Sequence, residues 1–394
     1  MAGTLFIVGG GMIKSADEIF SALIARAGGA KAKIAFIVTA SGSEPDDTFR
    51  SYAEDLVRLG VPRENLILVP LYAQHVRDER GYNAMTGDAD GLLELMEGVT
   101  GVWFTGGDQY FVSQCFLRKD GSDTKLLSRL REIYANGGVI GGSSAGAAIM
   151  SRVMIGEGSN RGVLSCETLY SYDTYDQLCE EDNPCAPLII TQGLGFFTEG
   201  VVDQHFNKRP RLLRLIETCL LNKENAKVGY AVSEDTALVY HEGAIEVMGS
   251  AAVYIVDCRN MMKKSAGNYA DITLHALQKG DAYDVRSGKV ALARESDAKR
   301  YDYARDYVSG GITGEAAFDG MIDKYLLSCK KESLYFCEKR NKPYFKGAAV
   351  YDAQGRTYLV VPEYFIGENT KGYMGACASF TELELAVTTV EVNI

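Results

Sequence analysis

The stretch Gly137-Gly-Val-Ile-Gly-Gly-Ser-Ser-Ala-Gly-Ala-Ala-Ile-Met150 joins a short apolar run, paired glycines, two serines and a series of small residues. This order predicts a strand, a sharp turn and a helix. Ser144 stands in Gly142-x-Ser144-x-Gly146, the nucleophile-elbow pattern, in which glycines give room where strand and helix meet and the serine takes a strained backbone conformation. The turn would expose the serine oxygen at a helix N-terminus, where backbone N–H groups and the helix dipole favour a developing oxyanion.

A plain Gly/Ser turn or a phosphate-binding loop has a similar composition. The order of apolar strand, paired glycines and small-residue helix favours a nucleophile instead. Ser143 is the rival serine, but the glycine frame is centred on Ser144. We therefore predict Ser144 as the nucleophile.

The composition limits the class of protein. The chain of 394 residues is 46% hydrophobic and has a net charge of −11, which predicts a sizeable core and argues against a nucleic-acid or acidic membrane partner. The negative charge suits a cationic substrate. The sequence has no apolar run of membrane-spanning length, no signal-peptide pattern, and nine scattered cysteines without a C-x-x-C pair. We expect a cytoplasmic protein with reduced thiols, no metal and no cofactor, assembled as a homo-oligomer, most simply a dimer.

Strands and helices alternate through the first 150 residues. Strand-like apolar runs lie at 4–8, 33–39, 65–69, 101–105 and in the elbow stretch, and helical spacing occurs at 15–27, 46–59, 88–96 and 125–135. This alternation predicts an α/β fold with a parallel sheet and helices on both faces. Ser15 and Glu18 predict a capping-box start for the first helix.

Three glycine-containing turns follow strands of this sheet, at 9–11, 106–109 and Ser144. Ligands of parallel α/β sheets bind at the carboxyl ends of the strands, so we expect the three turns to share one rim. The glycines at 9–11 lack the full dinucleotide-binding pattern, and we interpret them as a loop that borders the site. The N–H groups of Gly107 and Ala145 are the predicted oxyanion donors.

A serine nucleophile needs a general base, and the chain has four histidines. His205 follows a strand end among polar residues and is the predicted base. His241 and His275 sit beside apolar strand residues, as expected on the surface of a sheet, and His75 lies in a charged loop.

Charged residues surround the predicted base in the sequence. Arg209, Arg211 and Arg214 follow it, and their guanidinium groups suit carboxylate recognition, although a solvated helix start would have the same composition. Glu234 and Asp235 lie between two apolar runs. They form either a solvated hairpin turn or the acid that orients the histidine.

Two segments have a different character. Residues 165–187 are acidic, rich in tyrosine and without periodicity, which predicts a long surface loop that acts as a lid or a binding loop, or is disordered. From Phe318 a helix-like segment is followed by β-like runs at 347–351 and 357–362, in which we find no chemistry.

Four motifs in one order resemble the cyanophycinase-like serine peptidases, a family that includes α-aspartyl dipeptidase. The motifs are Phe104-Thr-Gly-Gly-Asp-Gln109, Gly142-Ser-Ser-Ala-Gly-Ala-Ala148, Asp203-Gln-His-Phe206 with the arginines that follow, and Glu234-Asp-Thr-Ala237. The resemblance covers 1–290, with the 165–187 loop as an insert, and leaves 291–394 as a C-terminal extension of unknown role.

The resemblance implies a flavodoxin-like three-layer sandwich with a mainly parallel sheet, related to class I glutamine amidotransferases, plus an α+β extension. It implies a Ser144-His205-Glu234 triad, with Glu157 in reserve as the acid. The family substrate is cyanophycin, a poly-aspartate with arginine on each β-carboxyl, and its product is the β-Asp-Arg dipeptide. The positions that match the family's substrate-binding residues are Gln109, Asp203, Gln204, Arg209, Arg211 and Arg214.

Three hypotheses for the function are therefore compatible with the sequence. The first is a cyanophycinase-type exopeptidase. The second is a serine peptidase or amidase that acts on small aspartyl or isoaspartyl peptides. The third is a non-catalytic relative that only binds a ligand.

Overall fold

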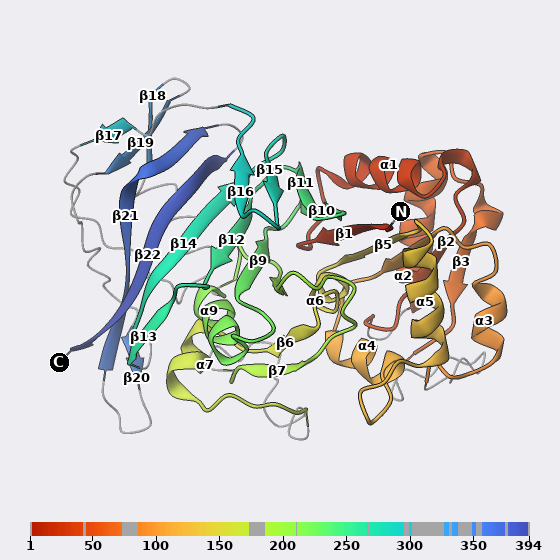
Figure 1. Cartoon of the computed structure of the whole chain (residues 1–394). Helices are drawn as coiled ribbons and strands as arrows, with labels where there is room; N and C mark the ends of the chain where they lie inside the picture. The colour runs from red at the N-terminus through yellow and green to blue at the C-terminus, as the bar shows by residue number, and fades with distance from the viewer. Residues whose placement is uncertain are drawn as a thin grey trace.

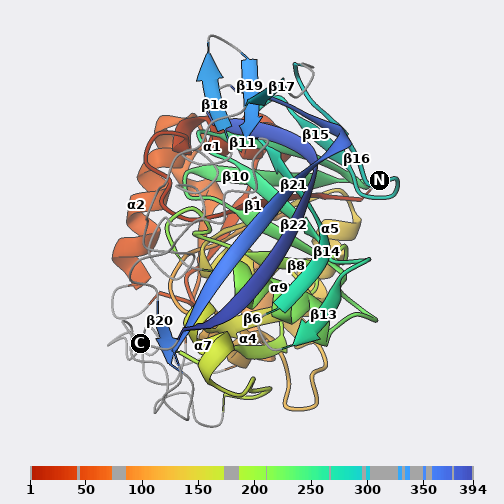
Figure 2. The same cartoon turned by 90° about the vertical axis from the view of Figure 1, so that its left-hand side faces the viewer.

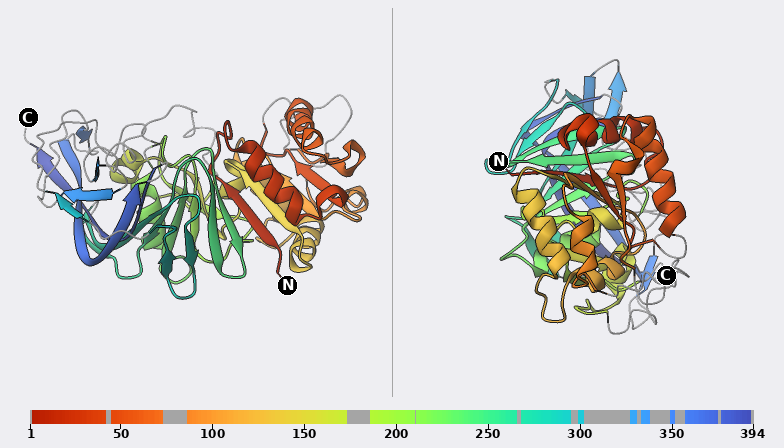
Figure 3. Two further views of the ribbon diagram at one scale, coloured as in Figure 1. Left: turned by 90° about the horizontal axis from the view of Figure 1, so that it is seen from above. Right: turned by 90° about the vertical axis from the view of Figure 1, so that its right-hand side faces the viewer.

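The structure is a computed structural model that describes residues 2–41, 45–72, 86–172, 186–209, 211–265, 268–294, 299–301, 327–330, 333–337, 349–351, 357–374 and 377–392. The molecule is elongated, with a helix-flanked sheet at one end and a second, strongly curved sheet at the other (Figures 1 and 3). His75 and the helix-like segment from Phe318 lie outside the described residues.

Five parallel strands form one half of the first sheet. In spatial order they are β1 (Thr4–Val8), β5 (Val139–Ser143), β4 (Gly101–Phe104), β2 (Ile34–Ile37) and β3 (Leu66–Val69). All but β3 are buried at every position. Burial on both faces requires continuous apolar runs, and these runs are what predicted the parallel α/β sheet.

The other half of this sheet is antiparallel. It continues from β1 through β10 (Thr236–His241), β11 (Ala244–Gly249), β15 (Ala282–Asp284) and β16 (Lys289–Ala291). Strands β10 and β11 are joined by Glu242 and Gly243, both with positive φ, as a two-residue hairpin turn requires. The sheet is therefore mixed, and the expectation of a mainly parallel sheet holds only for its N-terminal half.

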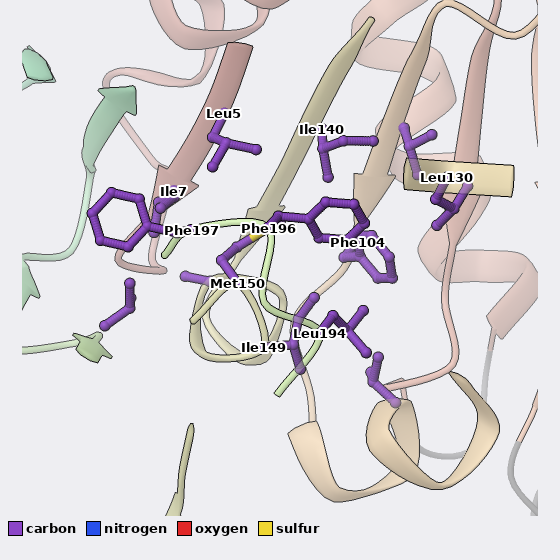
Figure 4. Close-up of a cluster of buried hydrophobic side chains, with 14 of the residues drawn as sticks. Leu5, Ile7, Phe104, Leu130, Ile140, Ile149, Met150, Leu194, Phe196 and Phe197 are labelled. Carbon is purple, nitrogen blue, oxygen red and sulfur yellow. The ribbon is translucent and has the colours of Figure 1, made fainter. Parts of the chain in front are cut away.

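Helices pack on both faces of the parallel strands. One face is covered by α1 (Ala16–Arg26) and α2 (Pro45–Arg58), whose buried side chains share a core cluster with Phe36 and Trp103. The opposite face carries α3 (Gly91–Leu95), α4 (Gln109–Phe116), α5 (Lys125–Ala135) and α6 (Ala145–Ala148). Figure 4 shows the core of this second face, where side chains of β1, β4 and β5 meet Leu130 of α5 and the segment from Leu194 to Phe197. Two short 3₁₀ helices, Gly29–Lys31 and Arg63–Asn65, precede β2 and β3.

The second sheet combines strands from before and after residue 290. Its order is β17 (Lys299–Tyr301), β19 (Ser333–Cys337), β21 (Thr357–Met374), β22 (Ala378–Val392), β14 (Asn268–Leu277), β12 (Val253–Asp257), β9 (Val228–Val232) and β8 (Val201–Asp203). Strands β13 (Met262–Ser265), β18 (Leu327–Lys330) and β20 (Ala349–Tyr351) pair at its margins. Helix α9 (Leu212–Leu221) packs on this sheet, and α7 (Asn160–Ser165) contacts α9. A separate pair is formed by β6 (Val153–Glu157) and β7 (Ile189–Gln192).

Strands β21 and β22 form a long C-terminal hairpin, which is at the front of the molecule in Figure 2. Strand β22 pairs with β14, and its Phe380, Leu383 and Leu385 are completely buried in one cluster with Leu215 and Leu274. The segments on the two sides of the predicted boundary at 290/291 therefore share a sheet and a core.

Two local expectations are wrong. Ser15 makes no side-chain cap on α1, because its hydroxyl donates to Asp235 instead, and Glu18 pairs with Lys279. His275 is not on a sheet surface but is only 2% exposed, and its Nδ1 contacts Thr381 and Glu382 of β22, the strand paired with β14. Among the described residues, no helix is long and apolar enough to cross a membrane.

Candidate active site

Ser144 has the backbone geometry of a nucleophile elbow. It lies between β5 and α6 with φ 57° and ψ −111°, a conformation that is unfavourable for a residue with a side chain. A Cβ at Gly142 would lie 2.4 Å from the carbonyl oxygen of Gly146, and a Cβ at Gly146 would lie 2.4 Å from that of Phe104. Both glycines of the pattern are thus required by the close approach of strand and helix.

His205 lies beside this serine at the end of β8. Its Nε2 is 2.7 Å from Ser144 Oγ, and its backbone N–H donates to the carbonyl of Gly9 at 2.8 Å. The residue has φ 49°, so it also has a left-handed backbone conformation. A Cβ at Gly10 would lie 2.2 Å from His205 Cε1, which shows that the imidazole packs directly on the glycine loop that follows β1.

Glu234 completes a chain of hydrogen bonds. Its Oε1 is 2.7 Å from His205 Nδ1, and its own N–H donates to Asn207 Oδ1 at 2.9 Å. A carboxylate at Nδ1 fixes the proton on that nitrogen and leaves Nε2 free to accept from the serine hydroxyl. The reserve acid Glu157 lies elsewhere, with Oε1 accepting the N–H of Gly158 at 3.0 Å.

The environment of His205 favours the neutral imidazole. Burial lowers its pKa to about 4, and the charges of Arg209 and Arg211 act in the same direction, while the hydrogen bond and charge of Glu234 oppose them. The ring is therefore unprotonated at neutral pH, as a general base must be.

The predicted oxyanion donors lie on both sides of Ser144. Gly106 precedes Gly107 and would place a Cβ 3.9 Å from Ser144 Oγ, so this turn runs past the serine oxygen. Gly107 has φ +133°, and its Cβ would lie 1.9 Å from the carbonyl oxygen of Ala40, so no other residue fits there. Within the part of the chain that the structure describes, neither Gly107 N–H nor Ala145 N–H donates to a protein acceptor.

Three of the predicted binding residues, on both sides of His205 in the sequence, form a buried ion network. Arg214 contacts both carboxylate oxygens of Asp203, at 2.9 and 2.5 Å, and donates to the carbonyl of Gly158 at 2.7 Å. Arg211 lies 3.7 Å from Asp203 and donates to the carbonyl of Gln204 at 2.7 Å. These three side chains are at most 8% exposed. The single carboxylate of Asp203 faces both guanidinium groups, so the network keeps a net positive charge.

The remaining predicted binding residues differ in their surroundings. Gln109 Nε2 donates to the carbonyls of Gly156 and Ile155, which ties the start of α4 to β6. Gln204 Oε1 is buried without a hydrogen-bond partner among the described residues. Arg209 is exposed, and its charge reaches His205.

Two features of this rim were not predicted. The first is Asp108: burial raises its pKa to about 6, the charge of Glu157 adds to this, and the hydrogen bond from the N–H of Tyr110 opposes it. In the sequence, only its position directly after Gly107 indicated that Asp108 lies at the site. The second feature is the loop at 9–15, which was expected to border the site but not to touch both His205 and Glu234. A Cβ at Gly11 would lie 2.8 Å from Glu234 Oε2.

An elbow serine, a neutral histidine and a carboxylate in one hydrogen-bonded chain are the features of a serine-type hydrolase. The family is defined by comparison: residues 5–248 match the model of peptidase family S51, and the chain belongs to that family. It is therefore a serine-type peptidase with a peptide or polypeptide substrate.

Curated relatives and solved structures are similar over most of the chain. A cyanophycinase of Synechococcus elongatus is 29% identical over 73% of this chain and 81% of its own length. A cyanophycinase of Geminocystis herdmanii is 30% identical over 73% of this chain and 95% of its own. The crystal structure of a peptidase from an acI-B1 Actinobacterium covers 72% of this chain and 97% of its own, with 21% identity and a TM-score of 0.48.

Proposed function

We propose that the protein is a cyanophycinase-type exopeptidase that hydrolyses cyanophycin to β-Asp-Arg dipeptides. The observation that carries the proposal is the chain of two 2.7 Å contacts from Ser144 Oγ through His205 to Glu234, built on an elbow. The choice of substrate is supported by the relatives, which are named cyanophycinases.

In the proposed reaction His205 Nε2 takes the proton of Ser144 while Oγ attacks the scissile backbone carbonyl. The negative charge on the carbonyl oxygen is stabilised by the N–H groups of Gly107 and Ala145. His205 then gives its proton to the leaving amine, and an acyl-enzyme remains on Ser144. Water, deprotonated by the same imidazole, hydrolyses the ester and restores the enzyme. Glu234 stabilises the imidazolium that forms twice in this cycle.

Of the six polar residues at the rim, two are assigned to the substrate and four to support of the site. We assign the exposed guanidinium of Arg209 to a substrate carboxylate, because a planar fork binds a carboxylate in a bidentate manner. Gln204 has an unused buried oxygen that suits a substrate N–H. Gln109 Nε2, the carboxylate of Asp203 and the guanidinium of Arg214 have protein partners, so these residues mainly hold β8 and α4 in place. Arg211 supports the same segment through its bond to the carbonyl of Gln204.

The test is incubation with insoluble cyanophycin, with wild type and Ser144→Ala in parallel and products identified by mass spectrometry. We expect β-Asp-Arg from wild type and at least a ~1000-fold slower release from the variant. Equal release from both would reject Ser144 as the nucleophile.

Small aspartyl or isoaspartyl peptides are the second candidate substrate. The start of the 165–187 insert lies against the rim, with the rings of Tyr172 and Tyr110 at 4.5 Å and the hydroxyl of Tyr172 next to Gly156. If Tyr172 and Tyr110 restrict access to Ser144, the enzyme would exclude a polymer but admit a dipeptide. Hydrolysis of a soluble dipeptide without release from cyanophycin would select this function.

A further inference from the structure

Asp235, the neighbour of Glu234, points away from the histidine and into the loop that follows β1. One of its carboxylate oxygens accepts the consecutive N–H groups of Ile13, Lys14 and Ser15, each at 2.9 Å. The other accepts the hydroxyls of Ser15 at 3.1 Å and Ser250 at 2.6 Å. A single carboxylate thus satisfies five donors from two distant segments of the chain.

The backbone of Asp235 is also bonded to this loop. Its N–H donates to the carbonyl of Gly10 at 2.8 Å, and its φ of 56° turns the chain sharply after Glu234. Main chain and side chain of one residue therefore hold both the start and the end of the loop at 10–15.

Apart from Met12, which packs against the core, the side chains at 10–13 contribute little packing. Glycine at 10 and 11 provides no side chain to pack, and Ile13 is 85% exposed. Yet the two glycines contact two members of the triad: Gly10 lies against the His205 ring and Gly11 against the Glu234 carboxylate. If the loop moved, the imidazole would lose the surface that keeps water from it.

We propose that Asp235 is a positioning residue of the catalytic triad, which fixes the glycine loop against His205 and Glu234 without touching the substrate. It rests on the proposed function, because it presupposes that Ser144, His205 and Glu234 act together. The carboxylate is suited to this task as an anion, since only the ionised form is an acceptor at both oxygens. Burial opposes the charge, but the hydrogen bonds from Ser250 and from the three amides outweigh it and lower the pKa of Asp235.

Asp281 offers a matched control. This carboxylate is 2% exposed and likewise accepts amides and hydroxyls, from Gln278, Ala293, Tyr373 and Ser379. Its donors all lie in the C-terminal part of the chain. Asp235→Asn and Asp281→Asn therefore remove the same kind of buried anion from two different places. Asparagine also tolerates the left-handed backbone at 235.

The experiment measures the rate at which an uncharged fluorophosphonate probe labels Ser144, as a function of pH, with thermal unfolding in parallel. We expect Asp235→Asn to label about 10-fold more slowly at neutral pH, because small misplacements of reacting groups are costly. If the displaced loop lets water reach His205, the pKa of the imidazole should also rise. The effects of Glu234, Arg209 and Arg211 on that pKa should stay unchanged. The acid limb of the profile should then move upward by about one pH unit, toward the ordinary histidine value.

Asp281→Asn should unfold at lower temperature yet label within about two-fold of wild type with an unchanged acid limb, since its anion lies outside the rim. Ser250→Ala keeps the carboxylate and removes one donor, and it decides the question if Asp235→Asn does not fold; we expect about three-fold slower labelling with the same direction of pH shift. Wild-type rates and an unmoved limb in Asp235→Asn, or an equal loss in Asp281→Asn, would overturn the proposal. Failure of wild type itself to label would instead reject Ser144 as the nucleophile.

Discussion

Two histidines with a lowered pKa lie in different parts of the molecule, and their hydrogen-bond partners differ. The His275 residue is 2% exposed and the His205 side chain 13%. Burial lowers the pKa of both His205 and His275 to about 4. His205 lies at the rim of the first sheet, between a serine hydroxyl and a carboxylate. His275 lies at the seam between β14 and β22, where Nδ1 accepts from the Thr381 hydroxyl at 2.9 Å and from the N–H of Glu382 at 3.2 Å.

The partners, rather than the pKa, distinguish the two sites. The N–H of Glu382 donates to Nδ1 of His275, so a proton on that nitrogen would face another N–H donor. At His205 the carboxylate of Glu234 stabilises a proton on Nδ1 and also the imidazolium formed when Nε2 takes a second. At the seam the neutral histidine thus accepts a hydrogen bond from the backbone at Nδ1, whereas at the rim it has the partners of a general base.

Changes at the seam should therefore affect stability and spare the chemistry. Leu383 is completely buried where β22 meets β14. We expect Leu383→Ala to lower the free energy of unfolding by about 3 kcal/mol through lost burial and a residual cavity. Labelling of Ser144 in the folded enzyme should stay within about two-fold of wild type.

The control is Glu384→Ala, one residue further along the same strand and exposed. It should change stability by less than about 0.5 kcal/mol. A loss of Ser144 reactivity in folded Leu383→Ala would mean that seam and rim are coupled, and the comparison would fail.

Changes at the rim should have the opposite signature. A Cβ on Gly10 would overlap the His205 ring at 2.2 Å, so Gly10→Ala must displace the imidazole or the loop. We expect a fall in the labelling rate of about 100-fold, equivalent to about 2.7 kcal/mol of activation free energy. The free energy of unfolding should change by much less than this activation free energy, as measured by thermal unfolding.

Gly60→Ala is the matched variant, because Gly60 has φ +97°, close to the +102° of Gly10, but open space around its Cβ. It reproduces the backbone strain without the collision. Equal rates in the two alanine variants would show that backbone strain, and not contact with His205, sets the effect.

The residues at the rim, around Ser144, were easier to predict from the sequence than the contacts at the seam between β14 and β22, for physical reasons. Ser144 is marked by a local pattern, because strain and close packing demand glycine at fixed spacing. His205 could be found by elimination among four histidines. The choice between Glu234 and Asp235 depends on which way each carboxylate points, which no local pattern encodes; the family resemblance favoured Glu234.

The seam depends on contacts between distant parts of the chain. The N–H of Glu382 donates to His275, which lies 107 residues earlier in the chain. An alternating strand pattern does not indicate which later strand will pair with it. The same reason explains Ser15: its local pattern predicted a helix cap, but a carboxylate 220 residues away accepts its hydroxyl instead. Short-range rules predicted the five parallel strands and the helices α1, α2, α3 and α5, and they failed where a distant partner competed.

The smallest expected effect concerns the charge that faces His205. The pKa of His205 is lowered first by burial and further by Arg209, which is exposed. Replacing that cation in Arg209→Gln should raise the pKa of the imidazole, so the protonated, inactive form would persist to higher pH. The acid limb of Ser144 labelling should therefore move upward by about 0.3 to 0.5 pH units at low salt, and by less at high salt, because an exposed charge is screened. Lys208→Gln removes an equal exposed charge from the neighbouring position. An upward shift in both variants would assign the effect to net charge, and a shift in Arg209→Gln alone would show that the rim tunes its histidine through a specific neighbour.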